Sequence, residues 1–153
     1  METDAVAFTS FIEEVGRPLR QALIAAYGPQ VAADVTADAF AYAWEHWARI
    51  SAMSNPAGYL YRVAQSSARR GIFRPPPRLD LSIAPTQSHW FEPELAPAMA
   101  SLSEKQRAAV VLVHGYGWTT TEVAEMWGVR FSTVKSYIDR AMKRLRKELG
   151  VDL

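Results

Sequence analysis

Hydrophobic residues recur every three or four positions through the first part of the chain. One such stripe consists of Phe8, Ile12, Val15 and Leu19. This is the spacing of an amphipathic helix. Pro18 falls within the stripe, and proline suits a first helical turn but disturbs a helix interior. We therefore predict one helix up to about Val15 and another from Pro18 to about Tyr27. Gly28 and Pro29 would close the second helix.

Two further helices are predicted before residue 71. Asp34 can begin the first of them, whose buried stripe would consist of Phe40, Ala43, Trp44 and Trp47. Because Trp44 and Trp47 lie on this stripe, we expect both indoles to be core residues. Asn55 followed by Pro56 is an N-cap and first-turn pair that opens the next helix. One face of that helix would consist of Leu60, Val63, Ala64 and Ser67.

Residues 71–98 differ from the segments on either side of them. They hold six of the nine prolines and no sustained hydrophobic period. We interpret them as a linker that would not hold its flanking domains rigidly together. Two adjacent aromatic residues, Trp90 and Phe91, are the exception, and we expect them to dock on a domain.

After the linker, a helix should begin at Ser101 or Ser103 and run through about Val113. The sequence Gly-Tyr-Gly at residues 115–117 would end it. We find no strand pattern of useful length and no internal repeat. The sequence therefore predicts an all-α protein of two small helical domains, residues 1–70 and 99–153, joined by a proline-rich linker.

The segment TTTEVAEMWGVRFSTVKSYI, residues 119–138, has the spacing of a helix-turn-helix. Thr119 and Glu122 form a capping box that starts a short helix to Trp127. Gly128 permits the tight turn to a last helix, from about Phe131 to Leu149. The angle between the two helices would be filled by Val123, Ala124, Val129, Val134 and Ile138. The inner face of the last helix would continue through Ala141, Leu145 and Leu149.

The start of the second helix of such a unit lies in a DNA major groove. Its side chains here can contact phosphates and base edges; they are Arg130, Ser132, Thr133, Lys135, Ser136, Asp139 and Arg140. A basic cluster follows, made of Lys143, Arg144, Arg146 and Lys147. This cluster would contact phosphates or form a solvated face that suits a helix C-terminus. An ordinary helical hairpin remains an alternative. We favour DNA binding because the small residue, the turn glycine and the polar edge coincide with a basic segment.

Charge and composition narrow the classes of function. The formal net charge is +1, but residues 99–153 carry 9 Lys+Arg against 6 Asp+Glu, which is consistent with an anionic partner. The absence of cysteine excludes disulfides, thiol nucleophiles and thiolate metal sites. His46, His89 and His114 are isolated from one another, and residues 114–118 lack the lysine of a phosphate loop. We therefore expect neither an enzyme nor a bound metal or cofactor.

No apolar run approaches the length of a membrane span, and the start METDAVAF lacks the basic and apolar regions of a signal peptide. We expect a cytoplasmic protein that does not insert into a membrane.

The segment LSEKQRAAVVLVHGYGWTTTEVAEMWGVRFSTVKSYIDRAMKRLRKEL, residues 102–149, closely resembles the C-terminal DNA-binding domain of bacterial RNA polymerase sigma factors of the extracytoplasmic-function (ECF) type. The matching residues are Leu102, Gln106, Arg107, Glu122, Val123, Ala124, Gly128, Val129, Thr133, Val134, Lys135, Ser136, Arg140, Lys143, Arg144 and Leu145. Before the linker, DVTADAFAYAWEHW and NPAGYLYRVAQSSARR resemble the N-terminal domain of the same family. Two domains in the family's order are more specific than one helix-turn-helix.

The resemblance implies a sigma factor that binds the β and β′ subunits of core RNA polymerase and directs promoter-specific transcription initiation. In the family, the first domain docks on the β′ clamp helices and captures the non-template strand of the melted promoter, while the second reads the upstream duplex. If the family's contacts are carried over to this sequence, the polymerase-binding residues would be Asp34, Asp38 and Glu45. Single-stranded DNA would face the loop at residues 51–55 and Tyr59, Tyr61, Arg62, Gln65, Arg69 and Arg70. We expect at least one of Tyr59 and Tyr61 to be exposed for stacking on bases.

Several positions depart from the residues usual in the family. Ala37 and Asp38 stand for glutamine and glutamate, and Tyr42 stands for a common arginine, so core binding is expected to be weaker or altered. The departures that face DNA are Tyr59, Gln65 and Ser66, where tryptophan, arginine and asparagine are frequent. Arg130 replaces a serine that often caps the recognition helix. The start of this helix is expected to fray or to shift to Ser132, while the arginine gains a phosphate contact.

Two other functions remain open. The chain could be a sigma-like DNA-binding regulator that does not engage polymerase. It could also act mainly through an anti-sigma factor, which is an expected partner of a sigma factor in either case.

Overall fold

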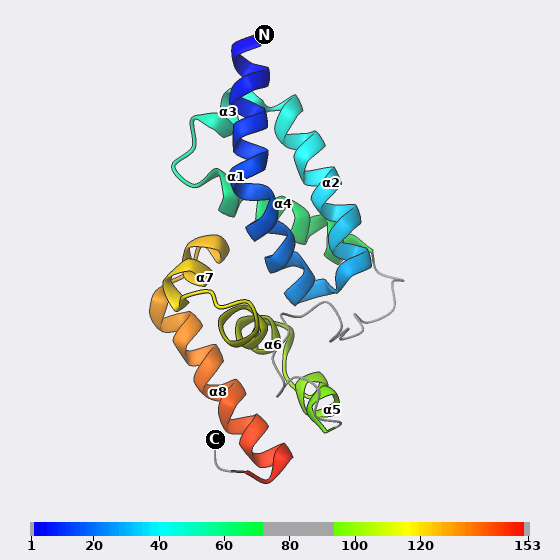
Figure 1. Ribbon diagram of the computed structural model, residues 1–153, viewed down its shortest axis with the longest axis vertical. Coiled ribbons are helices and arrows are strands. Elements are labelled where there is room, and N and C mark those ends of the chain that lie inside the picture. Colours follow the sequence, from blue (N-terminus) through cyan, green and yellow to red (C-terminus); the bar gives the residue numbers. More distant parts are fainter. Residues whose placement is uncertain (1, 72–93, 152–153) are drawn as a thin grey trace. The chain divides into compact units, whose positions relative to one another are not determined.

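The computed structural model describes residues 2–71 and 94–151, which contain helices, turns and loops but no strand (Figure 1). The chain divides into two compact units, residues 1–76 and 77–153. The predicted all-α class is confirmed for the described ranges. Most of the predicted linker lies outside them, including Trp90 and Phe91.

The N-terminal unit is a small helical bundle whose elements are α1 (Glu2–Tyr27), α2 (Pro29–Glu45), α3 (Trp47–Ser51) and α4 (Pro56–Arg70). Helices α1, α2 and α4 pack against one another. The largest fully buried side chains of this core are Leu19, Leu23, Val35, Ile50 and Leu60. Burial of such apolar surface is the main force that holds a bundle together.

Helix α1 passes through Pro18 without a break, so the prediction of two helices in this region is wrong. Proline removes the N–H that would donate to the carbonyl of Glu14, and its ring crowds that carbonyl. Continuing the helix keeps Leu19 fully buried and Val15 half-buried on the same apolar face. Packing of an amphipathic face contributes more to helix stability than local propensity does.

Helix α2 begins at Pro29, five residues before the predicted start at Asp34. Gly28 takes a φ of 83°, and Pro29 occupies the first turn, where a missing N–H does no harm. The expectation that Trp44 belongs to the core is also wrong, since it is 47% exposed. Trp44 lies in the last turn of α2, where its ring packs on Phe8 with centroids 5.1 Å apart. Trp47 is half-buried and also contacts Phe8.

The predicted cap of α4 is confirmed, because Asn55 Oδ1 accepts a hydrogen bond from the backbone N–H of Gly58 at 3.1 Å. The cap leaves no room for a side chain at position 58. A Cβ built on Gly58 would lie 2.5 Å from Asn55 Nδ2. On the predicted inner face, Leu60 and Ala64 are buried, and Val63 and Ser67 are half-buried.

The elements of the C-terminal unit are α5 (Leu95–Ala100), α6 (Glu104–Val110), a π-helical turn η3 (Val111–Gly115), α7 (Thr120–Trp127) and α8 (Phe131–Leu149). Helices α5, α6 and α7 all pack against α8 (Figure 1). Of the two predicted starts for the first helix, the structure selects Ser103, whose hydroxyl accepts from the N–H of Gln106 at 3.2 Å. Met99, Leu112, Val123 and Val134 are fully buried.

Helix α5 lies at the end of the segment that we predicted to be linker. Leu95, Ala98 and Met99 are buried in it. Pro97 is accommodated because it lies in the first turn, where backbone N–H groups have no helical partner. The prolines masked the spacing of four between Leu95 and Met99 in the sequence pattern.

Candidate nucleic-acid interfaces

Helices α7 and α8 form the helix-turn-helix that the sequence predicted. The Thr119 hydroxyl accepts from the N–H of Glu122 at 3.0 Å, and a Glu122 carboxylate oxygen accepts from the N–H of Thr119 at 3.0 Å. Gly128 makes the turn with a left-handed φ of 67°, which favours glycine. Between the helices Val123, Ala124 and Val134 are buried and Ile138 is half-buried. Val129 is 37% exposed, so the prediction that it fills this angle is wrong.

The predicted DNA-facing edge of α8 is mostly exposed to solvent. Its exposed members are Arg130, Ser132, Lys135, Arg140, Lys143 and Arg144, and its half-buried members are Thr133 and Ser136. Arg130 takes the N-cap position, but no side chain caps the helix, which begins at Phe131 rather than at Ser132. The opposite side of α8 is fixed by buried Val134, Ala141 and Leu145. The buried residues thus fix α8 so that its polar, basic edge is exposed to solvent.

Lys135 does not stand alone on this edge. Its Nζ lies 3.3 Å from Asp139 Oδ2, and the two side chains are 61% and 64% exposed. An exposed pair four residues apart on a helix contributes only about 0.3–0.5 kcal/mol. A phosphate or base edge could therefore displace Asp139 from Lys135 at little cost.

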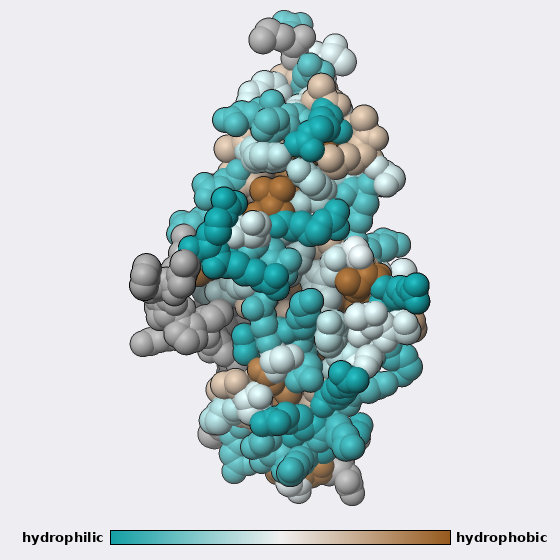
Figure 2. Space-filling view, turned by 180° about the vertical axis from the view of Figure 1, so that it is seen from behind, coloured by the Kyte–Doolittle hydropathy of each residue, from teal (hydrophilic) through white to brown (hydrophobic). Residues whose placement is uncertain are grey.

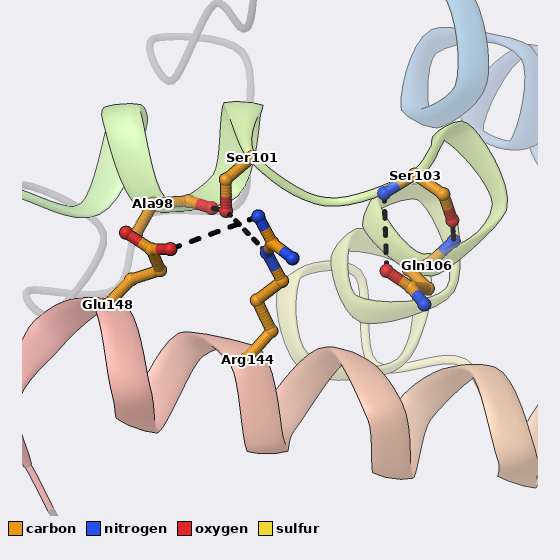
Figure 3. A network of polar contacts seen from close by, with 6 residues as sticks. All are labelled: Ala98, Ser101, Ser103, Gln106, Arg144 and Glu148. Atoms are coloured by element: carbon orange, nitrogen blue, oxygen red, sulfur yellow. Dashed lines mark hydrogen bonds and ion pairs between the residues drawn. The ribbon is translucent and has the colours of Figure 1, made fainter.

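Arg144 differs from the other predicted DNA-binding residues of α8 because it forms a hydrogen bond with a residue outside that helix (Figure 3). Its Nε donates to Ser101 Oγ at 3.4 Å, and its Nη2 lies 3.9 Å from Glu148 Oε1. Ser101 Oγ in turn donates to the carbonyl of Ala98 at 2.6 Å. Arg144 therefore links α8 to the end of α5. The neighbouring Lys143 is exposed and has no hydrogen bond or ion pair to another residue within 94–151.

Phe131 was not predicted to belong to this edge. Phe131 is 52% exposed at the first position of α8, close to half-exposed Val129 in the chain. Figure 2 shows that hydrophobic residues form only small separate patches among hydrophilic ones on the face in view. The pattern gave no signal, because Phe131 lies three residues before Val134, as an inner residue would.

The candidate single-strand interface is one side of α4. Arg62, Arg69 and Arg70 are exposed on it, and Tyr59 and Gln65 are half-buried. Tyr61 is only 3% exposed. Of the two tyrosines, Tyr59 alone offers ring surface to a ligand.

Tyr59 belongs to a polar cluster that joins three helices. Tyr42 from α2 and Tyr59 from α4 bring their hydroxyl oxygens to 3.3 Å. Arg49 from α3 donates to both hydroxyls, from Nη2 to Tyr42 at 2.7 Å and from Nη1 to Tyr59 at 3.4 Å. The hydrogen bond with Tyr42, followed by that from Arg49, lowers the pKa of Tyr59 below its ordinary value of 10.0. From the sequence, Tyr42 and Tyr59 were expected to be separate departures from the family, and no role was predicted for Arg49.

The predicted polymerase-binding residues lie along α2. Asp34, Asp38 and Glu45 are all exposed, as is Ala37. Spacings of four and seven residues place the three carboxylates on one side of the helix. They form an acidic stripe.

Neither a metal site nor a membrane-spanning helix is found within residues 2–71 and 94–151. No group of three or more His, Asp or Glu side chains there could hold a metal ion. None of the helices in those ranges is long and apolar enough to cross a membrane.

The chain resembles known proteins in both sequence and fold. A family model described as sigma-70, region 4, matches residues 94–145, a range that includes α5. The ECF RNA polymerase sigma factor SigL of Mycobacterium tuberculosis is 32% identical over an alignment of 136 residues that covers 78% of this chain and 77% of SigL. The RNA polymerase sigma-E factor of Streptomyces antibioticus is 44% identical over 64 residues, but this match covers only 42% of this chain and 36% of that protein.

Two solved structures share the fold. The sigma factor RpoE, in complex with the anti-sigma factor NepR from Bartonella quintana, has a TM-score of 0.63 and 23% identity, over 96% of this chain and 99% of RpoE. CnrH, in complex with the cytosolic domain of CnrY, has a TM-score of 0.61 and 24% identity, over 97% of this chain and 91% of CnrH. The identity with SigL over more than three quarters of both sequences shows that this chain belongs to the ECF family of RNA polymerase sigma factors, which bind core polymerase and direct promoter-specific transcription initiation.

Proposed function

We propose that this sigma factor recognises a promoter at two separate points. The N-terminal domain, residues 1–70, binds core polymerase and the unpaired non-template strand. The C-terminal domain binds the upstream duplex, and residues 71–98 join the two. Burial of Leu95 and Met99 supports including α5 in the C-terminal domain, which then begins a few residues before position 99.

The observation that carries the duplex-binding role is the exposed edge of α8. Arg130, Lys135 and Arg140 are exposed, while Val134 and Ala141 anchor the same helix in the core. The arginines and the lysine supply charge to phosphates and donors to guanine. The hydroxyls of Ser132, Thr133 and Ser136 add shorter-range contacts. Exposed Phe131 suits apolar contact with the C5-methyl group of thymine.

The single-strand role rests on α4. Tyr59 offers its ring for stacking on an unpaired base, which is worth about 1–3 kcal/mol per base. Exposed Arg62, Arg69 and Arg70 would neutralise the backbone, and Gln65 would face a base edge. Tyr61 acts here as a packing residue, because its ring is buried.

The acidic stripe of α2, made of Asp34, Asp38 and Glu45, is the proposed polymerase contact. A second partner is an anti-sigma protein, since both structurally similar sigma factors were solved with a partner, NepR in one and CnrY in the other. Such a partner would compete with polymerase for the factor. The proposed site of action is the cytoplasm, where polymerase and promoter DNA are found.

The test is an in vitro transcription assay in which core polymerase and the purified full chain are incubated with a genomic promoter library. We expect discrete transcripts that depend on the chain and share two sequence elements upstream of their start points. DNA binding without promoter-directed transcripts would contradict the proposal and favour a regulator that does not engage polymerase.

Two variants separate the proposed surfaces. Asp38→Asn should weaken association with core polymerase and leave binding to the isolated upstream duplex unchanged. Lys135→Ala should weaken binding to the isolated upstream duplex and leave association with core polymerase unchanged. A loss of both activities in either variant would show that the surfaces have been misassigned.

A further inference from the structure

The cluster of Tyr42, Arg49 and Tyr59 lies where α2, α3 and α4 meet, next to the loop at residues 51–55. We propose that Arg49 is a phosphate-binding residue of the single-strand interface, held in place by the two tyrosines. This inference rests on the proposed role of α4 in binding unpaired DNA. It adds a residue from α3 to that interface.

The charge of Arg49 is not neutralised by its partners. The guanidinium donates to two phenol oxygens, at 2.7 Å on Tyr42 and 3.4 Å on Tyr59, and both acceptors are uncharged in their phenol form. No carboxylate within residues 2–71 pairs with it. Arginine has five N–H donors in a fixed fork. Two of these N–H groups of Arg49 bond to the tyrosine hydroxyls, and the others remain available to a phosphate.

The position of the charge suits a nucleotide stacked on Tyr59. The Arg49 guanidinium carbon lies 5.5 Å from the centroid of the Tyr59 ring, within the range of a cation–π contact. A base is separated from its own phosphate by one sugar. A cation held beside the Tyr59 ring is therefore placed to neutralise the phosphate of a nucleotide stacked on that ring.

Tyr42 acts as a positioning residue in this arrangement. Its hydroxyl makes the shorter of the two bonds to Arg49, at 2.7 Å. Its ring is fixed in turn against the imidazole of His46, with centroids 4.3 Å apart. The long arginine side chain is thereby ordered before DNA arrives, which reduces the entropy lost on binding.

The experiment uses the full chain bound to core polymerase and a promoter fragment whose non-template strand is unpaired. The variants are Arg49→Met, Arg49→Lys and Tyr42→Phe, with Arg17→Met on α1 as the control for loss of an exposed arginine in the same unit. Affinity is measured from about 50 to about 200 mM salt, a range over which phosphate contacts change affinity strongly. Thermal melting verifies that each variant is folded.

Arg49→Met should lower the slope of log affinity against log salt by about 0.7, the value for one phosphate contact on a single strand. Arg49→Lys should keep the slope, because the charge remains, but bind more weakly because the fork is lost. Tyr42→Phe should also keep the slope and lose less affinity than Arg49→Met. The control should match the wild type.

An unchanged slope in folded Arg49→Met would overturn the assignment of Arg49 to a phosphate. The wild type provides a separate check on the underlying role. If unpairing the strand adds nothing to wild-type affinity, the proposed single-strand role of α4 is itself wrong.

Discussion

The hydroxyl oxygens of Tyr42 and Tyr59 lie 3.3 Å apart, although the two residues are 17 positions apart in the chain. Both residues depart from those common in ECF sigma factors, where arginine and tryptophan are frequent at these positions. An arginine at position 42 would place a second cation beside Arg49. A tryptophan at position 59 would have no oxygen to accept its hydrogen bond. The two departures are therefore compatible with each other and with Arg49.

This contact predicts an unusual ionisation. The hydrogen bond with Tyr42, and after it the one from Arg49, lower the pKa of Tyr59 below 10.0, whereas burial raises the pKa of Tyr116. Phenolate absorbance should therefore rise over a broad pH range, with one tyrosine ionising early. Tyr42→Phe should remove that early step. A single uniform step in the wild type would contradict the hydrogen-bonded cluster.

The lowered pKa of Tyr59 also makes the stability of the protein depend on pH. Well below the folded pKa, Tyr59 is protonated in both the folded and the unfolded state, so the lowered pKa adds nothing to stability there. As pH rises from the lowered folded pKa toward 10.0, the unfolded state holds more protons, and the free energy of unfolding gains a favourable contribution. The stability of the wild type relative to Tyr42→Phe should thus increase with pH in this window.

Asp139 should limit the affinity of α8 for duplex DNA. Asp139→Asn removes the partner that holds Lys135 at 3.3 Å and removes a charge that phosphates repel. We expect duplex binding to tighten about twofold, the equivalent of the roughly 0.3–0.5 kcal/mol of such a pair. Fluorescence anisotropy on a promoter duplex measures this. In the double variant with both changes, Lys135→Ala should abolish most of the gain in duplex affinity that Asp139→Asn gives.

Phe131 should contribute to sequence preference rather than to general affinity. Phe131→Ala is expected to reduce discrimination for thymine by about 0.8 kcal/mol, the value for burying one methylene-sized group, at one position of the upstream element. The sharper measurement replaces each thymine of that element by deoxyuridine, which lacks the C5-methyl group. One replacement should weaken the wild type and leave Phe131→Ala unaffected. Equal losses in both proteins at every position would remove Phe131 from the reading surface.

Lys143 and Arg144 are adjacent basic residues with different expected roles. Lys143→Ala should weaken duplex binding and lower the salt slope by about 0.9 if it removes one phosphate contact. Arg144→Ala should instead loosen α5, because it removes the hydrogen bond to Ser101 Oγ at 3.4 Å. Hydrogen exchange of residues 95–101 would detect this change. A larger salt-slope effect for Arg144→Ala than for Lys143→Ala would reverse the assignment.

The capping box of α7 should support the stability of the helix-turn-helix. Thr119→Ala removes the acceptor of the bond from the N–H of Glu122 at 3.0 Å and should cost about 1 kcal/mol. The matched control is Thr121→Ala, since Thr121 is exposed within the same first turn and caps nothing. Denaturant unfolding followed by tryptophan fluorescence compares the two. Equal midpoints would mean that the cap is not formed in solution.

Local signals in the sequence were sufficient for much of the fold. Asn55, Ser103, Thr119 and Gly128 each mark a helix boundary that the structure has. A cap depends on atoms within a few residues of one another, so its chemistry can be read directly from the sequence. The exposed edge of α8 followed from the same reasoning, because the buried stripe of the helix defines its opposite side.

The remaining features depend on contacts between distant segments. Pro18 lies within the part of α1, from Gly16 to Tyr27, whose buried residues pack in the bundle core, and Trp44 lies exposed in the last turn of α2. The bond from Arg144 to Ser101 and the cluster around Arg49 join residues of different helices. No periodic pattern within one helix contains that information.

The absence of a side chain at Gly58 links the geometry of a helix cap to the proposed single-strand interface. A methyl group there would fall 2.5 Å from the amide nitrogen of Asn55 and expel the amide from the first turn of α4. Tyr59 follows directly in the chain, and the loop at residues 51–55 ends at the displaced asparagine. A single alanine at position 58 would therefore disturb the proposed single-strand interface by displacing the Asn55 cap, with Tyr59 and the arginines of α4 unchanged in sequence.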